Sequence, residues 1–241
     1  DDKMLITDFN GEEGSTATEA NCQKYGYISS LDINGFGVTS GTGAGSNGSF
    51  VGANGSGDYV SWSWKAGGSG SDDYYKDGTG YGDATSAGMN AGTITPTGSS
   101  VNTQAGFSIV AYTGTGTADS FSHGLGNVPD CIIIKKLDTG TGNRDWVVYH
   151  KDLTSATYEI YLNRDISEYN SAGAMFASTP TSAVVNIGND DYINESAISY
   201  IAYSWRSIPN YSLIGGYRGS GLATDTPIIY TGFKPAWIMV K

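Results

Sequence analysis

A short aromatic sequence occurs twice in this chain, and the repetition limits what the chain can fold into. It reads YVSWSWK at residues 59–65 and YIAYSWR at residues 200–206. Two further sequences recur in the same order: FSIVAYTGTG (107–116) returns as YSLIGGYRGSG (211–221), and GLGNVPDCIIIKK (124–136) returns as GFKPAWIMVK (232–241). Echoes in a fixed order are typical of a structural unit that is used more than once. The sequence therefore predicts a repeated module.

The spacing of these echoes predicts where the modules begin and end. Ser108 and its counterpart Ser212 are 104 residues apart, whereas Tyr59 and its counterpart Tyr200 are 141 residues apart. The additional residues of the second interval lie in a stretch rich in glycine, serine and aspartate. We predict four parts: the closing part of a preceding module (1–66), an insertion or linker (67–104), a complete module (105–209) and the start of a further copy (210–241).

The predicted module has the period of two that is typical of β-strands. Segments of five to nine residues rich in Val, Ile, Tyr, Phe and Trp are separated by turn-forming clusters of Gly, Asn, Asp and Pro. We therefore expect an all-β protein of tandem antiparallel β-sandwich modules, jelly-roll-like, with very little helix. In such strands we expect Trp62, Trp64, Trp205 and Trp237 to pack in the core rather than to stack on a ligand.

Composition excludes two classes of partner. The chain carries a formal net charge of −11, which disfavours a surface that neutralises phosphates. No apolar run approaches the roughly 20 residues that span a bilayer. Cys22 and Cys131 are too few for a disulfide framework, and Cys131 lies in an apolar segment that predicts a buried side chain. Nucleic acid and membrane insertion are therefore not expected.

One short motif invites a catalytic interpretation. SHGLG, around His123, is similar to the loops that stabilise an oxyanion in some hydrolases. The chain has no G-x-S-x-G sequence that would supply a nucleophile, and the repeat places Tyr230 where His123 stands. We predict no catalytic residue and no enzymatic activity.

Two groups of residues are candidates for ligand binding. Tyr74, Tyr75 and Tyr81 lie in the polar stretch before the complete module, where a loop would have no core to bury them, and tyrosine rings can stack on sugars. No cofactor is expected; the nearest candidate is calcium, to which Asp190 and Asp191 offer carboxylates. They lack the spacing of a twelve-residue calcium loop, so a solvated turn remains the other interpretation.

The motifs resemble a known group of proteins. YVSWSWKAGG, NTQAGFSIVAYTGTGTADSFSHGLGNVPDCIIIKK, WVVYHKDL, YIAYSWRSIPNYSLIGGY and YTGFKPAWIMVK together resemble repeated β modules of tail-fibre-like virion structural proteins, especially of phages of marine bacteria and cyanobacteria. The resemblance covers residues 59–241. Residues 30–65 resemble the end of a lectin-like sandwich of the concanavalin/SPRY type.

The resemblance implies a structural subunit of a phage tail fibre or related extracellular virion appendage, which acts as a scaffold and attaches to the host surface. It implies a homo-oligomer or contacts with neighbouring virion proteins, and it carries over no catalytic residue. A carbohydrate-binding module, a bacterial surface adhesin or an extracellular filament protein is the alternative, with a host-surface glycan as ligand.

The last predicted part holds the candidates for contacts between subunits: Tyr211, Leu213, Ile214, Trp237 and Ile238. If the chain ends at Lys241, the strands of residues 211–241 are expected to pair with the incomplete first module of a neighbour, because unpaired strands invite strand addition. The other interpretation is that the sequence is a segment of a longer fibre protein. Both remain open at this stage.

Overall fold

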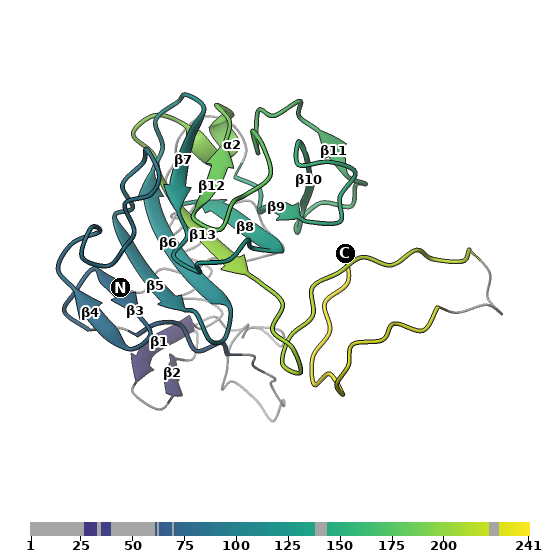
Figure 1. Cartoon of the computed structure of the whole chain (residues 1–241), viewed down its shortest axis with the longest axis horizontal. Helices are drawn as coiled ribbons and strands as arrows, with labels where there is room; N and C mark the ends of the chain where they lie inside the picture. Colours follow the sequence, from purple (N-terminus) through teal and green to yellow (C-terminus); the bar gives the residue numbers. More distant parts are fainter. Residues whose placement is uncertain are drawn as a thin grey trace, which may run out of the picture.

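The computed structural model describes residues 27–32, 35–39, 61, 63–68, 70–137, 144–221 and 227–241. Its elements, labelled in Figure 1, are β1 (Tyr27–Asp32), β2 (Gly35–Thr39), β3 (Tyr74–Lys76), β4 (Thr79–Tyr81), β5 (Gly98–Asn102), β6 (Phe107–Thr113), β7 (Asp119–Ser122), β8 (Cys131–Lys136), β9 (Val147–His150), β10 (Tyr158–Tyr161), β11 (Tyr169–Asn170), β12 (Val184–Ile187), α2 (Asp191–Asn194) and β13 (Ser199–Trp205). Among the described residues α2 is the only helix, which confirms the prediction of an all-β protein with very little helix.

Most of the strands form one large sheet. Nine strands follow the order β11-β10-β9-β8-β13-β6-β5-β3-β4, and a two-stranded sheet of β12 and β7 packs on one face (Figure 1). The main core, with Val110, Tyr112 and Phe121 among its buried residues, lies between the two sheets. All neighbours in the large sheet are antiparallel except β3 and β5, which are parallel. The sheet is therefore mixed, although all its other strand pairs are antiparallel as the sequence predicted.

Strand β13 lies in the middle of the large sheet, between β6 and β8. It pairs antiparallel with both, and Trp205 lies opposite Phe107 on one side and opposite Cys131 on the other. Its residues alternate between full and partial burial, as the period of two predicted. Tyr200 and Ala202 point into the main core, so the opposite face of the strand is left to its aromatic residues.

Stacked rings connect the large sheet to the rest of the sandwich. The ring of Tyr112 in β6 stacks on Phe121 in β7 at 4.5 Å and on Tyr200 in β13 at 5.3 Å between centroids. The Tyr112 hydroxyl donates to the carbonyl oxygen of Ile193 at 2.6 Å, and the Tyr200 hydroxyl donates to that of Asp191 at 2.8 Å. The two tyrosines thus satisfy backbone groups of α2 while their rings fill the core.

The stretch predicted to be an insertion or linker, residues 67–104, is part of the large sheet. It supplies β3, β4 and β5, and β5 pairs with β6 along five residues. Met89 and Val101 from this stretch are fully buried in the main core. The predicted boundary at residue 104 is therefore not a boundary of the sheet.

Parts of the other two predicted regions lie outside the described residues. Of residues 1–66 the structure describes the antiparallel hairpin of β1 and β2 and a few residues before Gly67. The described residues of 210–241 contain no strand, although they repeat the sequences of β6 and β8. That this segment begins a further module stays a prediction.

A buried carboxyl group in β10 makes stability depend on pH. Glu159 is fully buried, and its oxygens accept hydrogen bonds from the Ser171 hydroxyl at 2.9 Å and the Tyr161 hydroxyl at 3.4 Å. Burial raises the pKa of Glu159 from 4.5 to about 7, against the effect of these hydrogen bonds, because the charged form is poorly solvated. The folded protein therefore keeps this proton at a pH at which the unfolded chain has lost it.

Replacing this group with an amide is expected to remove that dependence. Because the folded pKa is raised, the contribution of Glu159 is fully present below pH 4.5 and is lost as the pH rises to about 7. In Glu159→Gln the amide oxygen accepts one of the two hydrogen bonds and the side chain no longer titrates, so the loss of stability across this window is expected to be smaller than in the wild type. Urea denaturation at several pH values measures this, and equal pH dependence of the two proteins would contradict it.

Candidate subunit-contact surface

The face of the large sheet that points away from the main core carries a row of aromatic rings, which we call the outer row. It consists of Phe107, Trp205, Tyr203 and Trp146. Successive rings are stacked, with centroids 5.0 Å, 6.2 Å and 6.4 Å apart. A second apolar cluster underlies the row and includes Cys131, Ile133 and Val148. The large sheet is thus apolar on both faces, although only one face carries the second sheet.

Two tryptophans from distant parts of the chain meet beside Trp205 of the outer row. The Trp64 ring packs edge-on against Trp205 at 6.4 Å and against Trp237 at 5.2 Å. Both Trp64, at 40%, and Trp237, at 38%, remain substantially exposed. They are therefore only partly packed, in contrast to the prediction that they lie in the core. Trp62 lies outside the described residues.

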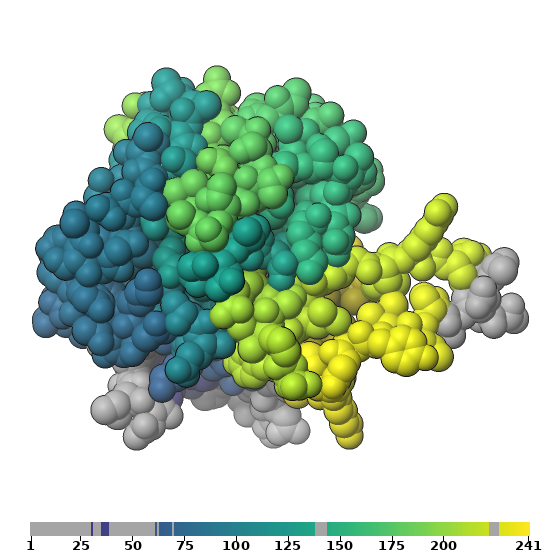
Figure 2. Space-filling model, viewed as in Figure 1, coloured from purple at the N-terminus to yellow at the C-terminus, as the bar shows by residue number. Residues whose placement is uncertain are grey.

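Residues 207–221 and 227–241, together called the tail, follow β13 and project beyond the sandwich (Figures 1 and 2). Its beginning is held in place, because the backbone N–H of Ser207 donates to Asp130 at 2.6 Å and that of Gly216 donates to Asp152 at 2.6 Å. Ile214 packs against the cluster under the outer row, and its N–H donates to the Ser207 hydroxyl. The first ten residues of the tail are thus positioned by the sandwich.

The tail is where exposed apolar side chains gather. Ten of the sixteen large hydrophobic side chains that are exposed among the described residues belong to it. Of the five predicted contact residues, the structure brings Ile214 and Trp237 towards the outer face, whereas Tyr211, Leu213 and Ile238 are 48% to 69% exposed. The other exposed apolar residues of the tail were not among the predicted contact residues: Tyr217, Ile228, Ile229, Tyr230, Met239 and Val240. These residues alternate only weakly with polar ones, so no strand pattern marks them in the sequence. Several, such as Met239 and Val240, lie in the repeated sequences and could have been predicted as contact residues for that reason.

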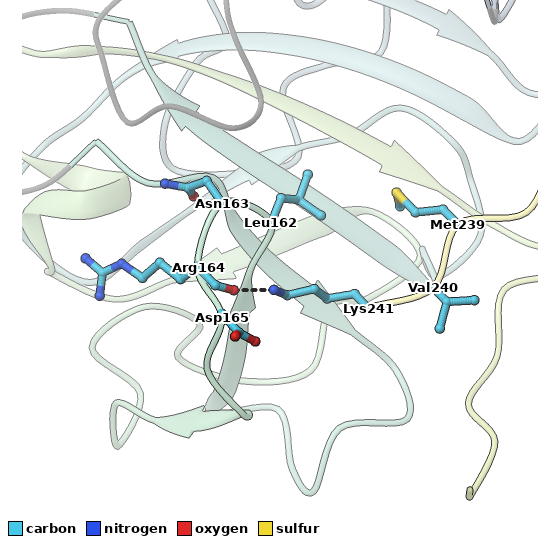
Figure 3. A pocket seen from close by; sticks show the side chains of 7 residues that line it. All are labelled: Leu162, Asn163, Arg164, Asp165, Met239, Val240 and Lys241. Atoms are coloured by element: carbon cyan, nitrogen blue, oxygen red, sulfur yellow. Dashed lines mark hydrogen bonds between the residues drawn. The ribbon is translucent and has the colours of Figure 1, made fainter. Parts of the chain in front are cut away.

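The end of the tail borders a cleft of about 510 Å³ at the edge of the large sheet (Figure 3). The Lys241 ammonium donates to the carbonyl oxygen of Arg164. The guanidinium of Arg164 forms an ion pair with the buried Asp145 and lies over the Tyr161 ring. The cleft is lined by Leu162, Asn163, Arg164, Asp165, Met239, Val240 and Lys241. One wall is thus fixed by an ion pair, while the other is the exposed tail.

The three tyrosines predicted to bind glycans are part of the sandwich. Tyr74 is only 8% exposed, and its hydroxyl donates to the carbonyl oxygen of Pro96 at 2.5 Å, so its ring is not available for stacking on a sugar. Tyr81 packs against the main core. Tyr75 is half-buried, and a Cβ added to Gly68 would lie 2.8 Å from its ring. The prediction assumed a loop without a core, whereas these residues belong to β3 and β4.

The remaining polar candidates have structural roles. Asp190 caps α2, because its carboxylate accepts from the N–H of Tyr192 at 3.0 Å, and Asp191 is the first residue of that helix. No group of three potential metal ligands occurs among the described residues. His123 is fully buried; its Nδ1 accepts from the N–H of Leu125 and its Nε2 donates to the carbonyl oxygen of Thr181. Burial lowers the pKa of His123, so the ring is neutral and holds a turn together.

Comparison with known proteins identifies the family of the chain. Within the part that the structure describes, no helix is long and apolar enough to cross a bilayer. No curated protein and no solved structure matches the sequence. One family model matches residues 12–241, and it is described as a domain of unknown function, DUF7483. Because this match covers nearly the whole chain, the protein belongs to the DUF7483 family.

Proposed function

We propose that this protein is a structural subunit of a phage tail fibre or a related extracellular virion appendage, in which it serves as a rigid β scaffold, contacts neighbouring subunits and helps to attach the particle to a host surface. The resemblance of its repeated motifs to tail-fibre modules supports the setting in a virion. The gathering of exposed apolar side chains on the tail supports the contact role, and this observation carries the proposal.

The tail has the properties of a surface that another protein covers. Exposed apolar patches of this kind are uncommon on monomeric proteins and mark interaction sites. Its first residues are fixed to the sandwich by Asp130 and Asp152, so the apolar groups are presented in a defined place. The whole chain carries a net charge of −11, which favours solubility of the subunit, so the exposed apolar side chains of the tail are the adhesive part.

Removing apolar side chains from the tail is expected to weaken self-association. Leu213→Ser and Ile238→Ser each remove a hydrophobic group whose burial is worth about 1.5–3 kcal/mol, so each is expected to raise the dissociation constant by about 10-fold to 100-fold. Sedimentation velocity over a range of protein concentrations measures this directly.

Two substitutions outside the tail are matched controls. Val128 and Ile166 are 47% and 46% exposed, close to the 48% of Leu213, but they lie in turns of the sandwich. Val128→Ser and Ile166→Ser are expected to leave association unchanged. If all four variants behave alike, the contact surface is not the tail.

Antibody labelling of intact phage particles in electron micrographs tests whether the protein is part of a virion. The proposal requires label on the fibres or appendages.

A further inference from the structure

The outermost strand of the large sheet, β11, is short and exposed (Figure 1). It has two residues, and among the described strands it pairs with β10 alone. The pairing places Tyr158 opposite Asn170 and Glu159 opposite Tyr169. Exposed backbone pairing of this kind belongs to the least stable part of a fold. The position of β11 therefore depends on the contacts around it.

The turn that follows β11 has an unfavourable backbone conformation. Ala172 has a φ of +54°, which residues with a Cβ rarely adopt, and Gly173 follows at +87°. The Asn170 side chain accepts from the N–H of Ala172 at 2.8 Å, and the Ser171 hydroxyl accepts from the N–H of Met175 at 3.2 Å. These contacts hold a conformation that the backbone alone disfavours.

The Ser171 hydroxyl also joins this turn to a buried carboxyl group. It donates to Glu159 at 2.9 Å, whereas the carbonyl oxygen of Thr157 is farther away at 3.5 Å. Glu159 is fully buried and lies on the same face of β10 as Tyr161, a residue of the main core. The strained turn is thus tied to the buried face of the neighbouring strand.

The surroundings of this carboxyl group disfavour its charged form. Burial raises the pKa of Glu159 to about 7, hydrogen bonds from Ser171 and Tyr161 oppose the rise, and the charge of Asp190 adds to it. The Arg164 guanidinium lies over the Tyr161 ring but forms its ion pair with Asp145. The titratable or charged side chains around the site are Tyr161, Arg164, Asp190 and Tyr192.

Contacts that do not involve the buried carboxyl group fix the chain on both sides of the turn. Before β11, the Glu168 carboxylate accepts from the N–H of Thr154 at 2.9 Å and from its hydroxyl. After the turn, Met175 is buried in the main core, and its carbonyl oxygen accepts from the N–H of Gly188 at 2.6 Å. Residues 169–173, which we call the edge segment, lie between these two fixed points.

We propose that the edge segment opens away from β10 when Glu159 loses its proton, while the rest of the sandwich stays folded. In the open state the carboxylate reaches water and the strained turn relaxes. Because the closed state binds this proton more tightly, closing is fully favoured below pH 4.5 and is weakened as the pH rises to about 7. Opening leaves the outer edge of β10 unpaired, and such an edge accepts an added strand. The edge segment is thus a pH-dependent cover of the sheet, separate from the tail.

Hydrogen exchange followed by mass spectrometry tests this on the full chain. Rates are measured at pH values from 5 to 8, and each is divided by the rate of an unstructured peptide of the same sequence at that pH. The N–H groups of Ala172, Ala174 and Met175 have acceptors in the closed state, so their exchange reports opening. From pH 5 to pH 8 the corrected exchange is expected to rise about 10-fold to 100-fold and to level off above about pH 7.

Two variants and a reference strand serve as controls. Glu159→Gln removes the titrating group and is expected to abolish the rise. Glu168→Gln removes a nearby carboxyl group whose pKa is lowered by hydrogen bonds from Thr154, so the rise is expected to remain. The central strand β13 exchanges through global unfolding, so dilute urea is expected to speed its exchange but not that of the edge segment.

Three results would overturn the inference. They are exchange in the wild type that does not depend on pH after correction, a rise that persists in Glu159→Gln, and an edge segment that exchanges no faster than β13. The last result would mean that Glu159 acts on global unfolding alone. If Glu159→Gln does not fold, the wild type decides: the exchange has to level off at the pH at which the ¹³C resonance of the Glu159 carboxyl titrates, and a plateau elsewhere contradicts the proposal.

Discussion

A fragment of residues 105–209, the module that the echoes delimit, is expected to be unfolded in water at 25 °C, whereas a fragment of residues 66–209 is expected to fold. The shorter fragment lacks β3, β4 and β5 and the loop between β4 and β5. It loses Met89, Ile94 and Val101 from the main core, each at most 6% exposed. Burial of one such side chain contributes about 1.5–3 kcal/mol, and a whole domain is stable by about 5–15 kcal/mol.

The loss of β5 also affects the strand that it covers. β6 pairs with β5 from Phe107 to Ala111, so the shorter fragment exposes a long, apolar edge at the centre of the former sheet. We expect no cooperative thermal transition by far-UV circular dichroism and a tendency to aggregate. The longer fragment, which lacks only the first 65 residues and most of the tail, is the control. A cooperative transition of similar midpoint in both fragments would show that residues 67–104 are dispensable.

The strands of residues 105–209 could be predicted because their apolar residues are the ones that the fold buries. Buried positions such as Val110, Tyr112 and Tyr200 are apolar and alternate with less buried ones, so the period of two could be recognised in the sequence. The echoes also identified β6, β8 and β13 as corresponding units. That β13 separates β6 from β8 could not be read from the sequence, since strand order depends on which edges the folded chain leaves free.

Residues 67–104 were misjudged because their strands are short and rich in turn-forming residues. β3 and β4 have three residues each, and β5 reads GSSVN. β3 joins the sheet through a parallel pair with β5, which leaves no hairpin signal between them. The glycines that suggested a flexible loop lie close to Tyr75 instead: a Cβ added to Gly68 would lie 2.8 Å from its ring. Composition alone does not distinguish these two uses of glycine.

The contact surface was predictable in part. Its residues follow from the echo, since Trp237 and Ile238 stand where β8 has two buried residues. The outer row was not foreseen as a feature, because Trp146 reaches Tyr203 only through the order β9-β8-β13 of the sheet. The sequence of one strand does not show which residues of other strands become its neighbours in the sheet.

Replacement of Glu195 is expected to destabilise the protein by about 3 kcal/mol, because it leaves a buried charge without its carboxylate. The ammonium of Lys136 at the end of β8 is fully buried, and it lies 2.8 Å from the Glu195 carboxylate, which is itself only 17% exposed. The ring of Tyr200 is a further neighbour, with the nitrogen 5.9 Å from the centroid. That weaker attraction remains in Glu195→Ala and does not replace the ion pair.

Removal of the charge is expected to cost less than removal of its partner. Lys136→Met keeps most of the buried aliphatic chain, so we expect a loss of about 1 kcal/mol or less, and Lys136→Met combined with Glu195→Ala should be more stable than Glu195→Ala alone. Urea denaturation at pH 7 measures all three. Asp73→Ala removes an exposed carboxylate and is expected to change stability by less than about 0.5 kcal/mol. If Lys136→Met destabilises as much as Glu195→Ala, and the double variant loses the sum of both, the two side chains act independently. The pair would then not be what holds β8 and the residue after α2 together.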